Sequence, residues 1–266
     1  MHGIGNDFVL VKASDLPVES EWPGLARRMC DRRFGIGSDG LLIAAPGAAA
    51  PLAMRMLNPD GSESEMCGNG IRCFAQFARE QGLASINPLP VETGAGVLHL
   101  DVLSDGQVRV DMGPARLTRG EIGMTGTDSE QFVNQTVRGW PGTAVSMGNP
   151  HLVLFVEDIQ QVDAARDGAP LEHHEAFPNR VNVHFVQVVN PGHLIQKTWE
   201  RGAGVTLACG TGACACGVAA ALTGRASRDV QIDLPGGRLR IEWAENGHVF
   251  MTGPATKVFD GTWLDD

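Results

Sequence analysis

Two cysteines in this chain stand in short glycine-rich stretches of the same kind. The first stretch is residues 66–72 (MCGNGIR), with Cys67, and the second is residues 208–214 (ACGTGAC), with Cys209. Each reads as a cysteine at a tight turn that opens into a helix. The start of a helix offers backbone N–H groups and the positive end of the helix dipole, which suit a carboxylate and favour a thiolate. The pair predicts acid–base chemistry on a substrate that carries a carboxylate.

The composition narrows the classes of protein that could carry such chemistry. At 266 residues the chain exceeds one typical domain, so two domains are expected. A net charge of −10 without a basic cluster argues against nucleic acid or a membrane surface as a partner. The chain has no run of 18 apolar residues and no apolar leader, which predicts a soluble, cytoplasmic protein. Its six cysteines should be reduced thiols, and their spacing matches no zinc motif, so no metal site is predicted.

The chain repeats itself at an offset of about 142 residues. Gly5-Asn6 and Gly148-Asn149 each precede an apolar strand pattern, Asn58 precedes Cys67 by nine residues, and Glu200 precedes Cys209 by nine. Both halves end in alternating strands joined by a hairpin turn, 96–115 in the first half and 237–255 in the second. An offset that holds at several separate landmarks indicates that the chain is a duplication.

Each half is predicted to be a β-rich domain with one prominent helix after its cysteine turn. The helices are expected at 70–81 and 212–222, and the second is apolar on all sides, so it should thread the middle of a curved sheet. The fold class is therefore α+β: two pseudo-symmetric domains, each a curved, barrel-like sheet of mixed or antiparallel strands wrapped round a central helix. The expected domains are 1–117 and 138–255, with 118–137 as a linker and 256–266 packing back on the first domain. The strands are expected at 8–12, 40–44, 53–57 and 97–110 in the first half, and at 152–156, 183–189, 196–200, 230–234 and 239–251 in the second.

Two like domains face each other most simply across a pseudo-two-fold axis, with a ligand in the cleft between them. That arrangement would bring Cys67 and Cys209 to opposite sides of one bound molecule. One thiolate would remove a proton from one face of a carbon while the opposing thiol delivers a proton to the other face. We therefore expect an enzyme that inverts a stereocentre, with two thiols that titrate as a coupled pair.

The remaining candidate residues flank the two cysteines. His151 and Glu200 are titratable groups of the second half only, so they could tune the thiols or hold a substrate amine. Arg201 could bind a second carboxylate, and backbone N–H groups at both cysteine turns could bind the reacting one. The candidate binding residues are Asn6, Asn58, Asn149 and Asn182, together with Gly68, Asn69, Gly210 and Thr211 at the turns. Structural interpretations stay open beside these: asparagines near Gly and Pro often form turns, a histidine is often structural, and Glu200-Arg201 could be a surface pair.

These motifs together resemble diaminopimelate epimerase. They are residues 2–8 (HGIGNDF), 58–62 (NPDGS), 67–72 (CGNGIR), 146–151 (SMGNPH), 200–204 (ERGAG) and 206–213 (TLACGTGA), in order along nearly the whole chain. The resemblance implies a cofactor-independent epimerase of LL- and meso-2,6-diaminopimelate, on the bacterial route to lysine and the cell-wall precursor. It implies Cys67 and Cys209 as the acid–base pair, with His151 and Glu200 modulating them. The asparagines and Arg201 would contact the substrate.

The sequence departs from the family pattern at three positions. Gly40 stands where some members place a substrate-contacting Gln, and Val205 replaces a common Glu. Phe259 replaces a Tyr at a dimer contact of some members, so a homodimer is implied less firmly.

Two alternative functions stay open. A proline or hydroxyproline racemase-like enzyme could share the scaffold, although Arg201 and the asparagines suit a second amino-acid head group. A non-catalytic amino-acid-binding or redox-sensing protein is the alternative from another class.

Overall fold

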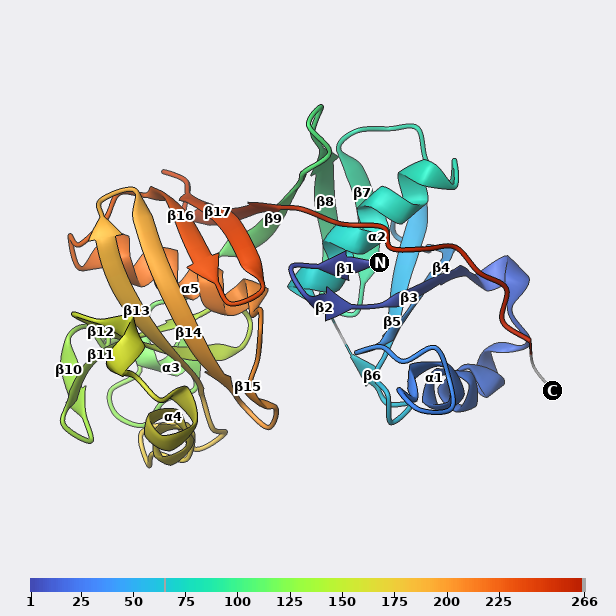
Figure 1. Ribbon diagram of the computed structural model, residues 1–266. Coiled ribbons are helices and arrows are strands. Elements are labelled where there is room, and N and C mark those ends of the chain that lie inside the picture. Colours follow the sequence, from blue (N-terminus) through green and yellow to red (C-terminus); the bar gives the residue numbers. More distant parts are fainter. Residues whose placement is uncertain (65, 265–266) are drawn as a thin grey trace. The chain divides into compact units, whose positions relative to one another are not determined.

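The computed structural model describes residues 1–64 and 66–264 and divides them into two compact units (Figure 1). Unit 1 consists of residues 1–109 together with the segment from Gly253 onward, and unit 2 is the continuous stretch Val110–Thr252. Unit 1 is therefore assembled from two separate parts of the chain.

In unit 1 a curved sheet surrounds one central helix, α2 (Gly68–Glu80). The strands pair in the order β8-β7-β5-β4-β3, and α2 packs against β4, β8 and the small β1–β2 ribbon. A second helix, α1 (Trp22–Cys30), packs against β4 and β5. The strands are β1 (His2–Gly3), β2 (Asn6–Asp7), β3 (Val9–Lys12), β4 (Leu41–Pro46), β5 (Leu52–Leu57), β6 (Glu63–Ser64), β7 (Leu89–Thr93), β8 (Gly96–Val102) and the first residues of β9 (Val108–Pro114).

Unit 2 repeats this plan around α5 (Gly210–Leu222). Its strands pair in the order β10-β11-β12-β13-β14-β16-β17-β18-β9, and α5 packs against five of them, β11, β12, β13, β16 and β17. Two further helices are α3 (Arg119–Ile122) and α4 (Ala164–Glu172). The strands are β10 (Gln135–Val137), β11 (Trp140–Ser146), β12 (Pro150–Val156), β13 (Asn182–Asn190), β14 (His193–Glu200), β15 (Gly204–Val205), β16 (Asp229–Leu234), β17 (Gly237–Trp243) and β18 (His248–Gly253).

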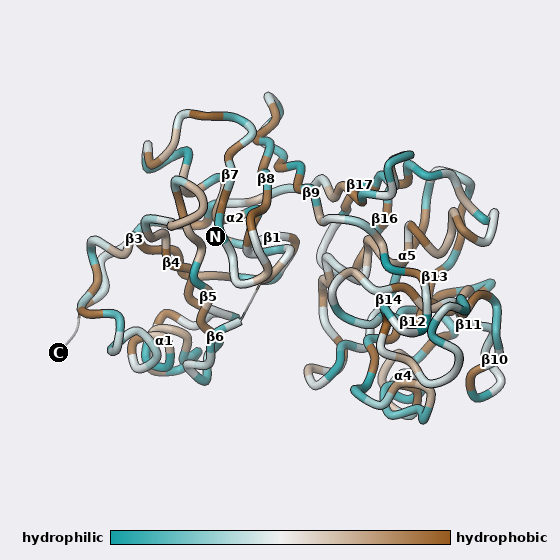
Figure 2. Tube along the Cα trace, turned by 180° about the vertical axis from the view of Figure 1, so that it is seen from behind, coloured by the Kyte–Doolittle hydropathy of each residue, from teal (hydrophilic) through white to brown (hydrophobic). Residues whose placement is uncertain are grey.

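The two central helices meet their sheets in different ways, as their sequences predict. In α5 nearly every residue from Gly210 to Ala220 is buried, which confirms that an all-apolar helix must be surrounded. In α2 one face is buried through Ile71, Phe74 and Ala78, while Arg79 and Glu80 are exposed. Figure 2 shows hydrophobic colour along β4 and β5 and hydrophilic colour in the outer loops.

The duplication is visible in the register of the strands. The antiparallel pair Leu41↔Leu57 of unit 1 corresponds to Val183↔Trp199 of unit 2, where both partners move by 142 residues (183 − 41 and 199 − 57). The parallel pairs β3–β4 and β12–β13 correspond in the same way, as do β5–β7 and β14–β16. Equivalent pairing of equivalent residues confirms the repeat.

The structure differs from the predicted domain boundaries at the linker. Residues 118–137 lie inside unit 2, where Ile122, Met124 and Phe132 are buried in its core. A capping box between Thr118 and Glu121 starts α3 in this segment. The Gly and polar residues of the segment suggested a linker, but its few apolar side chains anchor it to unit 2.

Helices α1 and α4 were not predicted, because each contains residues that normally interrupt a helix. Pro23 and Gly24 open α1, and Gly168 and Pro170 lie within α4. Proline is tolerated in the first turn of a helix, where its missing N–H has no partner to lose. Gly168 lets α4 approach β14 closely, because a Cβ there would lie 2.5 Å from the Cβ of Trp199.

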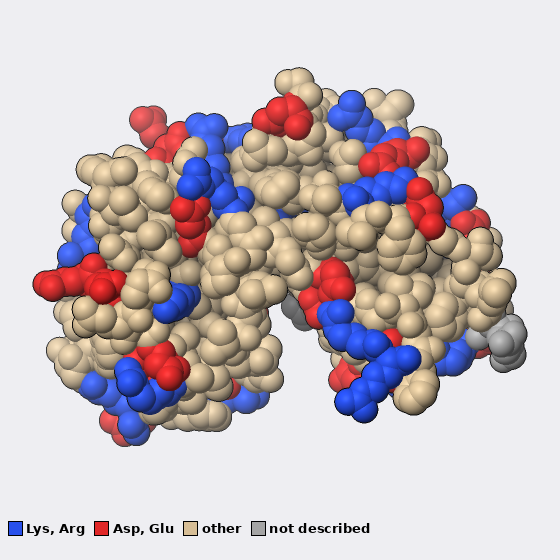
Figure 3. All heavy atoms as spheres, in the orientation of Figure 1, with Lys and Arg blue, Asp and Glu red and all other residues tan. Residues whose placement is uncertain are grey.

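Charged side chains of both signs are interspersed on the face shown in Figure 3. Several form ion pairs, such as Arg32 with Asp7 and Asp39, and Arg240 with Asp229. This mixture is consistent with the absence of a basic cluster in the sequence. Among the described residues, no helix combines the length and the apolar character needed to cross a membrane.

Candidate active site

Cys67 of unit 1 is the N-cap residue of α2. Its backbone is extended (φ −135°, ψ 118°), and the first intrahelical hydrogen bond runs from Ile71 N to Cys67 O at 2.8 Å. The Cys67 sulfur accepts a hydrogen bond from Gly70 N at 3.5 Å and lies 3.6 Å from Asn6 Oδ1. The backbone N–H groups of Gly68 and Asn69 belong to the first turn, where a helix supplies no acceptor of its own. The predicted turn at a helix start is thus confirmed, with the Cys67 sulfur beside the first backbone N–H groups of α2.

Two asparagines and an arginine hold the turn of Cys67 in place. Asn6 accepts a hydrogen bond from Asn69 Nδ2 at 3.2 Å, and its own amide donates to Asp39 at 2.6 Å. The fully buried Arg72 donates to Gly68 O at 2.8 Å and to Asn69 Oδ1 at 3.1 Å. The Asn69 side chain is therefore tied to the protein on both sides of its amide group.

Asn58 lies elsewhere in unit 1, in the turn that follows β5. Its amide donates to Ser62 Oγ at 3.0 Å, and Gly61 adopts a positive φ in the same turn. Asn58 thus forms a turn in the structure. Gly40 is buried, and a Cβ at this position would lie 3.1 Å from Leu57 O, so a side chain there would crowd the backbone at the end of β5.

Cys209 of unit 2 occupies the position equivalent to Cys67, as the N-cap of α5. Its backbone is again extended (φ −126°, ψ 103°), and Ala213 N donates to Cys209 O at 2.9 Å. The residue is 6% exposed. Thr211 Oγ1 lies 3.8 Å from the Cys209 sulfur and accepts a hydrogen bond from Asn149 Nδ2 at 3.4 Å. The two sulfurs thus occupy equivalent positions, but their polar neighbours differ: Asn6 lies beside Cys67, whereas Thr211 lies beside Cys209.

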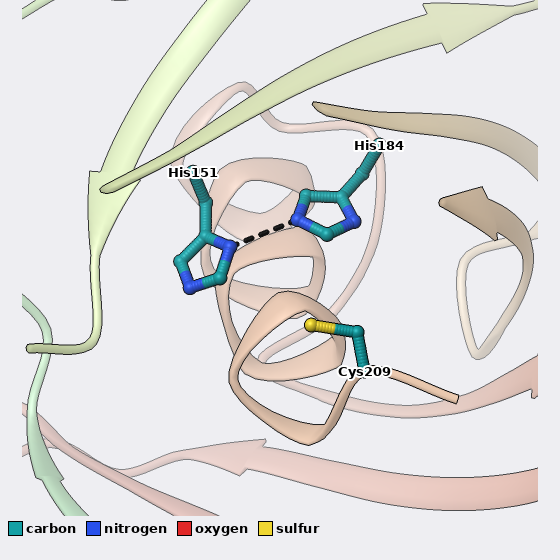
Figure 4. A group of neighbouring side chains, drawn as sticks. All are labelled: His151, His184 and Cys209. Atoms are coloured by element: carbon teal, nitrogen blue, oxygen red, sulfur yellow. Dashed lines mark hydrogen bonds between the residues drawn. The ribbon is translucent and has the colours of Figure 1, made fainter. Parts of the chain in front are cut away.

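Two buried histidines lie beside Cys209, and only His151 was expected there. His151 on β12 and His184 on β13 are fully buried, with His151 Nδ1 2.9 Å from His184 Nε2. Figure 4 shows the Cys209 sulfur directed toward the two imidazoles. Burial, followed by the charges of His184 and Arg201, lowers the pKa of His151 well below 6.5, and burial lowers the pKa of His184 to about 3. Both rings are therefore neutral at pH 7.

A sequence signal for His184 existed. It follows Asn182 by two residues in a strand, so both side chains share one face of the sheet, and the adjacent parallel strand carries His151 opposite Asn182. The alternation of side chains along β13 thus placed His184 on the same face of the sheet as Asn182.

Glu200 ends β14 and contacts Cys209. Thr206 Oγ1 donates to Glu200 Oε1 at 2.5 Å, and Cys209 forms a side-chain hydrogen bond with the same carboxyl group. Burial raises the pKa of Glu200, and the two hydrogen bonds oppose that rise. Glu200 is therefore held where its protonation responds to the state of Cys209.

Asn182 and Arg201 are joined to each other. The buried Asn182 accepts a hydrogen bond from the backbone N–H of Arg201 at 3.0 Å and donates to Pro150 O at 3.0 Å. Arg201 is exposed, and its guanidinium donates to Asn179 O at 3.0 Å. Asn182 therefore positions the backbone of Arg201, and the arginine side chain is the one presented to solvent.

The donor atoms of His151, His184 and Cys209 lie within 4.8 Å of one another, a grouping that resembles a metal site. The ring nitrogens are already engaged, however. His151 and His184 face each other, His151 Nε2 faces Asn149 Oδ1 at 2.9 Å, and His184 Nδ1 faces Thr198 Oγ1 at 3.0 Å. A metal ion would have to replace these hydrogen bonds, so we interpret the group as a hydrogen-bonded chain.

The remaining thiols differ from Cys67 and Cys209 in their surroundings. Burial raises the pKa of Cys73 to about 12 and raises that of Cys216 well above 9.0. Cys30 is buried beside Ser38, and burial raises its pKa as well. These residues act as small apolar side chains at neutral pH.

Comparison with solved structures identifies the fold class. A probable proline racemase from Agrobacterium radiobacter K84 superposes with a TM-score of 0.65 at 17% identity, covering 99% of this chain and 92% of that one. A phenazine biosynthesis protein of the PhzF family from Bacillus anthracis gives 0.65 at 16% identity, covering 96% and 92%. The helix-in-sheet repeat of this chain therefore has the fold of these solved structures.

The sequence comparisons are more specific. A family model described as diaminopimelate epimerase matches residues 1–118 and 143–258. The diaminopimelate epimerase of Moorella thermoacetica is 53% identical over 98% of this chain and 96% of its own length. That of Desulforudis audaxviator is 51% identical over 99% and 98%. The chain belongs to the diaminopimelate epimerase family.

Proposed function

We propose that the protein is an isomerase that interconverts LL- and meso-2,6-diaminopimelate without a cofactor, in the biosynthesis of lysine and the peptidoglycan precursor. The observation that carries the proposal is the equivalent placement of two sulfurs, each on the N-cap residue of the central helix of its unit. Membership of the family supports the choice of substrate.

In the proposed reaction Cys67 and Cys209 act on opposite faces of one α-carbon. One thiolate takes the α-proton and becomes a thiol, while the electron pair left on carbon is delocalised into the neighbouring carboxylate. The other thiol then gives its proton to the opposite face of that carbon and becomes a thiolate. No oxidant or reductant is consumed, and the next turnover in the opposite direction starts from the exchanged protonation states.

The first turn of each helix supports the binding of the reacting carboxylate. Backbone N–H groups of Gly68-Asn69 and Gly210-Thr211 stand at the positive ends of two helix dipoles, where negative charge is favoured. These groups would stabilise the charge that grows on the carboxylate as the proton leaves.

The polar residues around the cysteines would divide the other tasks. His151 and Glu200 would modulate the thiol of Cys209. Asn6, Asn58, Asn149, Asn182 and Glu200 would contact the substrate, and Arg201 would bind the distal carboxylate. The exposed guanidinium of Arg201 supports a substrate with two amino-acid head groups over a small cyclic one.

The test is incubation of the enzyme with LL-diaminopimelate in D2O without added cofactor. We expect deuterium at one α-carbon and formation of the meso isomer, read by NMR and chiral chromatography. Cys67→Ala and Cys209→Ala should each abolish epimerisation, because each removes one of the two proton carriers. Cys30→Ser is the matched control, since Cys30 is a buried thiol of unit 1 beside Ser38, and it should retain activity.

Two results would contradict the proposal. The substrate assignment is wrong if proline or hydroxyproline is labelled in D2O and diaminopimelate is not. The two-thiol mechanism is wrong if either alanine variant still epimerises diaminopimelate at the rate of the unaltered enzyme.

We further propose that the protein is cytoplasmic and forms a homodimer. Val258 and Phe259 are 65% and 61% exposed, as apolar side chains at a protein interface would be in a single chain. Sedimentation analysis of the protein and of Phe259→Asp tests the dimer, and a monomeric mass for the unaltered protein would exclude it.

A further inference from the structure

A chain of hydrogen-bonded side chains crosses three neighbouring strands of unit 2 and leads to Cys209. His151 stands on β12, His184 on β13, and Gln196 and Thr198 on β14, and all four are buried. The partly buried Asn149 directly precedes β12. Gln196 Nε2 lies 2.9 Å from Thr198 Oγ1 and 3.2 Å from His184 Nδ1. Together with the contacts of His151 to His184 and to Asn149, both 2.9 Å, these bonds link Gln196 to Asn149 without a gap.

With the orientations that the amides of Gln196 and Asn149 have in the structure, the direction of the hydrogen bonds follows from both ends of this chain. At one end Gln196 Nε2 can only donate, so His184 Nδ1 must accept and the proton of His184 is on Nε2. At the other end Asn149 Oδ1 can only accept, so the proton of His151 is on Nε2 and its Nδ1 must accept. The two deductions agree: His184 Nε2–H donates to His151 Nδ1. The other tautomer of either ring would place two N–H groups against each other.

The last part of the chain reaches the sulfur. With its oxygen facing His151, Asn149 turns its NH2 group toward Thr211 Oγ1 and donates to it. The Thr211 hydroxyl hydrogen is then available for the Cys209 sulfur at 3.8 Å. A donated hydrogen bond favours the charged form of an acidic group, here the thiolate.

The first turn of α5 is shaped to receive the ring of His184. A Cβ at Gly212 would lie 2.8 Å from His184 Nε2 and 2.9 Å from the Cys209 sulfur, closer than side chains tolerate. The absence of a side chain at position 212 thus lets the second histidine approach the cysteine turn.

We propose that His184 is a positioning residue for Cys209: it fixes His151 in the Nε2–H tautomer and thereby, through Asn149, presents the Thr211 hydroxyl to the sulfur as a donor. In this proposal His184 acts through other residues and contacts neither the substrate nor the substrate's α-carbon. The kinetic part of this inference rests on the proposed function of Cys209 as a proton carrier.

Other ionisable groups near Cys209 are kept unchanged in the test. They are Glu200, which forms a hydrogen bond with Cys209, Cys216 on α5, and Arg201, whose charge acts on His151. Differences between variants at position 184 therefore report on the chain alone.

The first experiment needs no variant. Two-bond 1H–15N correlation spectra of the histidine-labelled protein show which ring nitrogen carries the proton. We expect Nε2–H for both His151 and His184 at pH 7. A proton on Nδ1 of His151 would overturn the proposal, because the chain would then run in the opposite direction.

The second experiment compares His184→Leu with His184→Gln. Leucine removes the donor, whereas the glutamine amide retains one near the place of Nε2. For His184→Leu we expect a rise of about one pH unit in the midpoint of Cys209 alkylation by iodoacetamide, followed by mass spectrometry, and a fall of about tenfold in kcat with little change in KM. His184→Gln should restore most of both values. His193→Gln, which alters a partly exposed histidine paired with Asp233, is the control and should change neither.

The outcomes separate this inference from the proposed function. An unchanged Cys209 midpoint and an unchanged His151 tautomer in folded His184→Leu would refute the positioning role. If instead the unaltered protein fails to epimerise diaminopimelate, the proposed function fails, and the tautomer and alkylation measurements still decide the role of His184. Should His184→Leu not fold, the labelled unaltered protein and His184→Gln carry the test.

Discussion

The substitution Gly212→Ala tests how tightly His184 packs against α5, and Gly24→Ala is its matched control. Both glycines are the third residue of a helix, α5 and α1 respectively. A Cβ at Gly24 would meet only the flexible Nη1 of Arg28, at 3.7 Å. A Cβ at Gly212 would meet His184 Cε1 at 2.3 Å, with the Cys209 sulfur on the same side. The same change is therefore made in an open and in a closed environment.

The two substitutions should change the free energy of unfolding in opposite directions. Alanine gains about 1 kcal/mol over glycine in either helix, because it loses less backbone entropy on folding. At Gly24 that gain should appear in full. At Gly212 the methyl group displaces a ring held by hydrogen bonds on both sides, and overpacking costs about 3 kcal/mol at the upper end of its range. The net result is a loss of about 2 kcal/mol, so the two variants should differ by about 3 kcal/mol in the free energy of unfolding.

Urea denaturation followed by circular dichroism measures this difference, and peptide-level hydrogen exchange assigns each change to its unit. Gly212→Ala should also disturb the His151–His184 hydrogen bond, seen in the histidine NMR spectra. The reasoning is refuted if Gly212→Ala is as stable as Gly24→Ala, because the close contact of His184 with α5 would then be absent.

Three further predictions follow from burial. Acidification from pH 6.5 to 5.5 should lower the free energy of unfolding by about 1 kcal/mol for each of His151 and His184 in urea titrations, since the unfolded histidines bind protons that the folded ones, with lowered pKa, do not. If the free energy of unfolding of His184→Gln falls as steeply over this pH range as that of the unaltered protein, the prediction is contradicted. Arg72→Ala should lower the free energy of unfolding by about 3 kcal/mol, because three hydrogen bonds to protein acceptors are lost. Arg79 is exposed, so Arg79→Ala serves as the control and should change the free energy of unfolding by less than about 0.5 kcal/mol. Cys73, whose pKa burial raises to about 12, should resist iodoacetamide at pH 8 until the protein is unfolded, and rapid native labelling detected by mass spectrometry would contradict its burial.

The repeat and the central elements could be predicted because their signals are local. The alternation in the hairpins and the glycine turns at Cys67 and Cys209 each involve a few adjacent residues. The predicted helices at 70–81 and 212–222 begin two residues later than α2 and α5, since glycine was taken for the turn and not for the first helical residue. A helix can begin with glycine when the residue before it, here cysteine, serves as the N-cap.

Long-range packing accounts for what sequence reasoning missed. Helix α4 forms despite Gly168 and Pro170, because Leu171 joins a core that includes Phe185, far along the chain. His184 belongs to the Cys209 site through His151 on the neighbouring strand β12 and through its close approach to Gly212 on α5. The backbone partners of Asn182, Pro150 O and Arg201 N, lie at other positions along the chain that the sequence did not connect with it. No local pattern shows which partner a polar side chain will find.

The discontinuity of unit 1 affects the order in which the chain can fold during synthesis. Residues 110–252 form unit 2 without a break, so a ribosome releases every strand of it before the last segment appears. Unit 1 must wait for that segment: Thr256 pairs with His2, Arg72 donates to Pro254 O at 3.2 Å, and Trp263 packs against the core beside α1. Unit 1, which is begun first, is therefore completed only after unit 2 has been made, and the turn of Cys67 gains its full set of supports only once Pro254 has been synthesised.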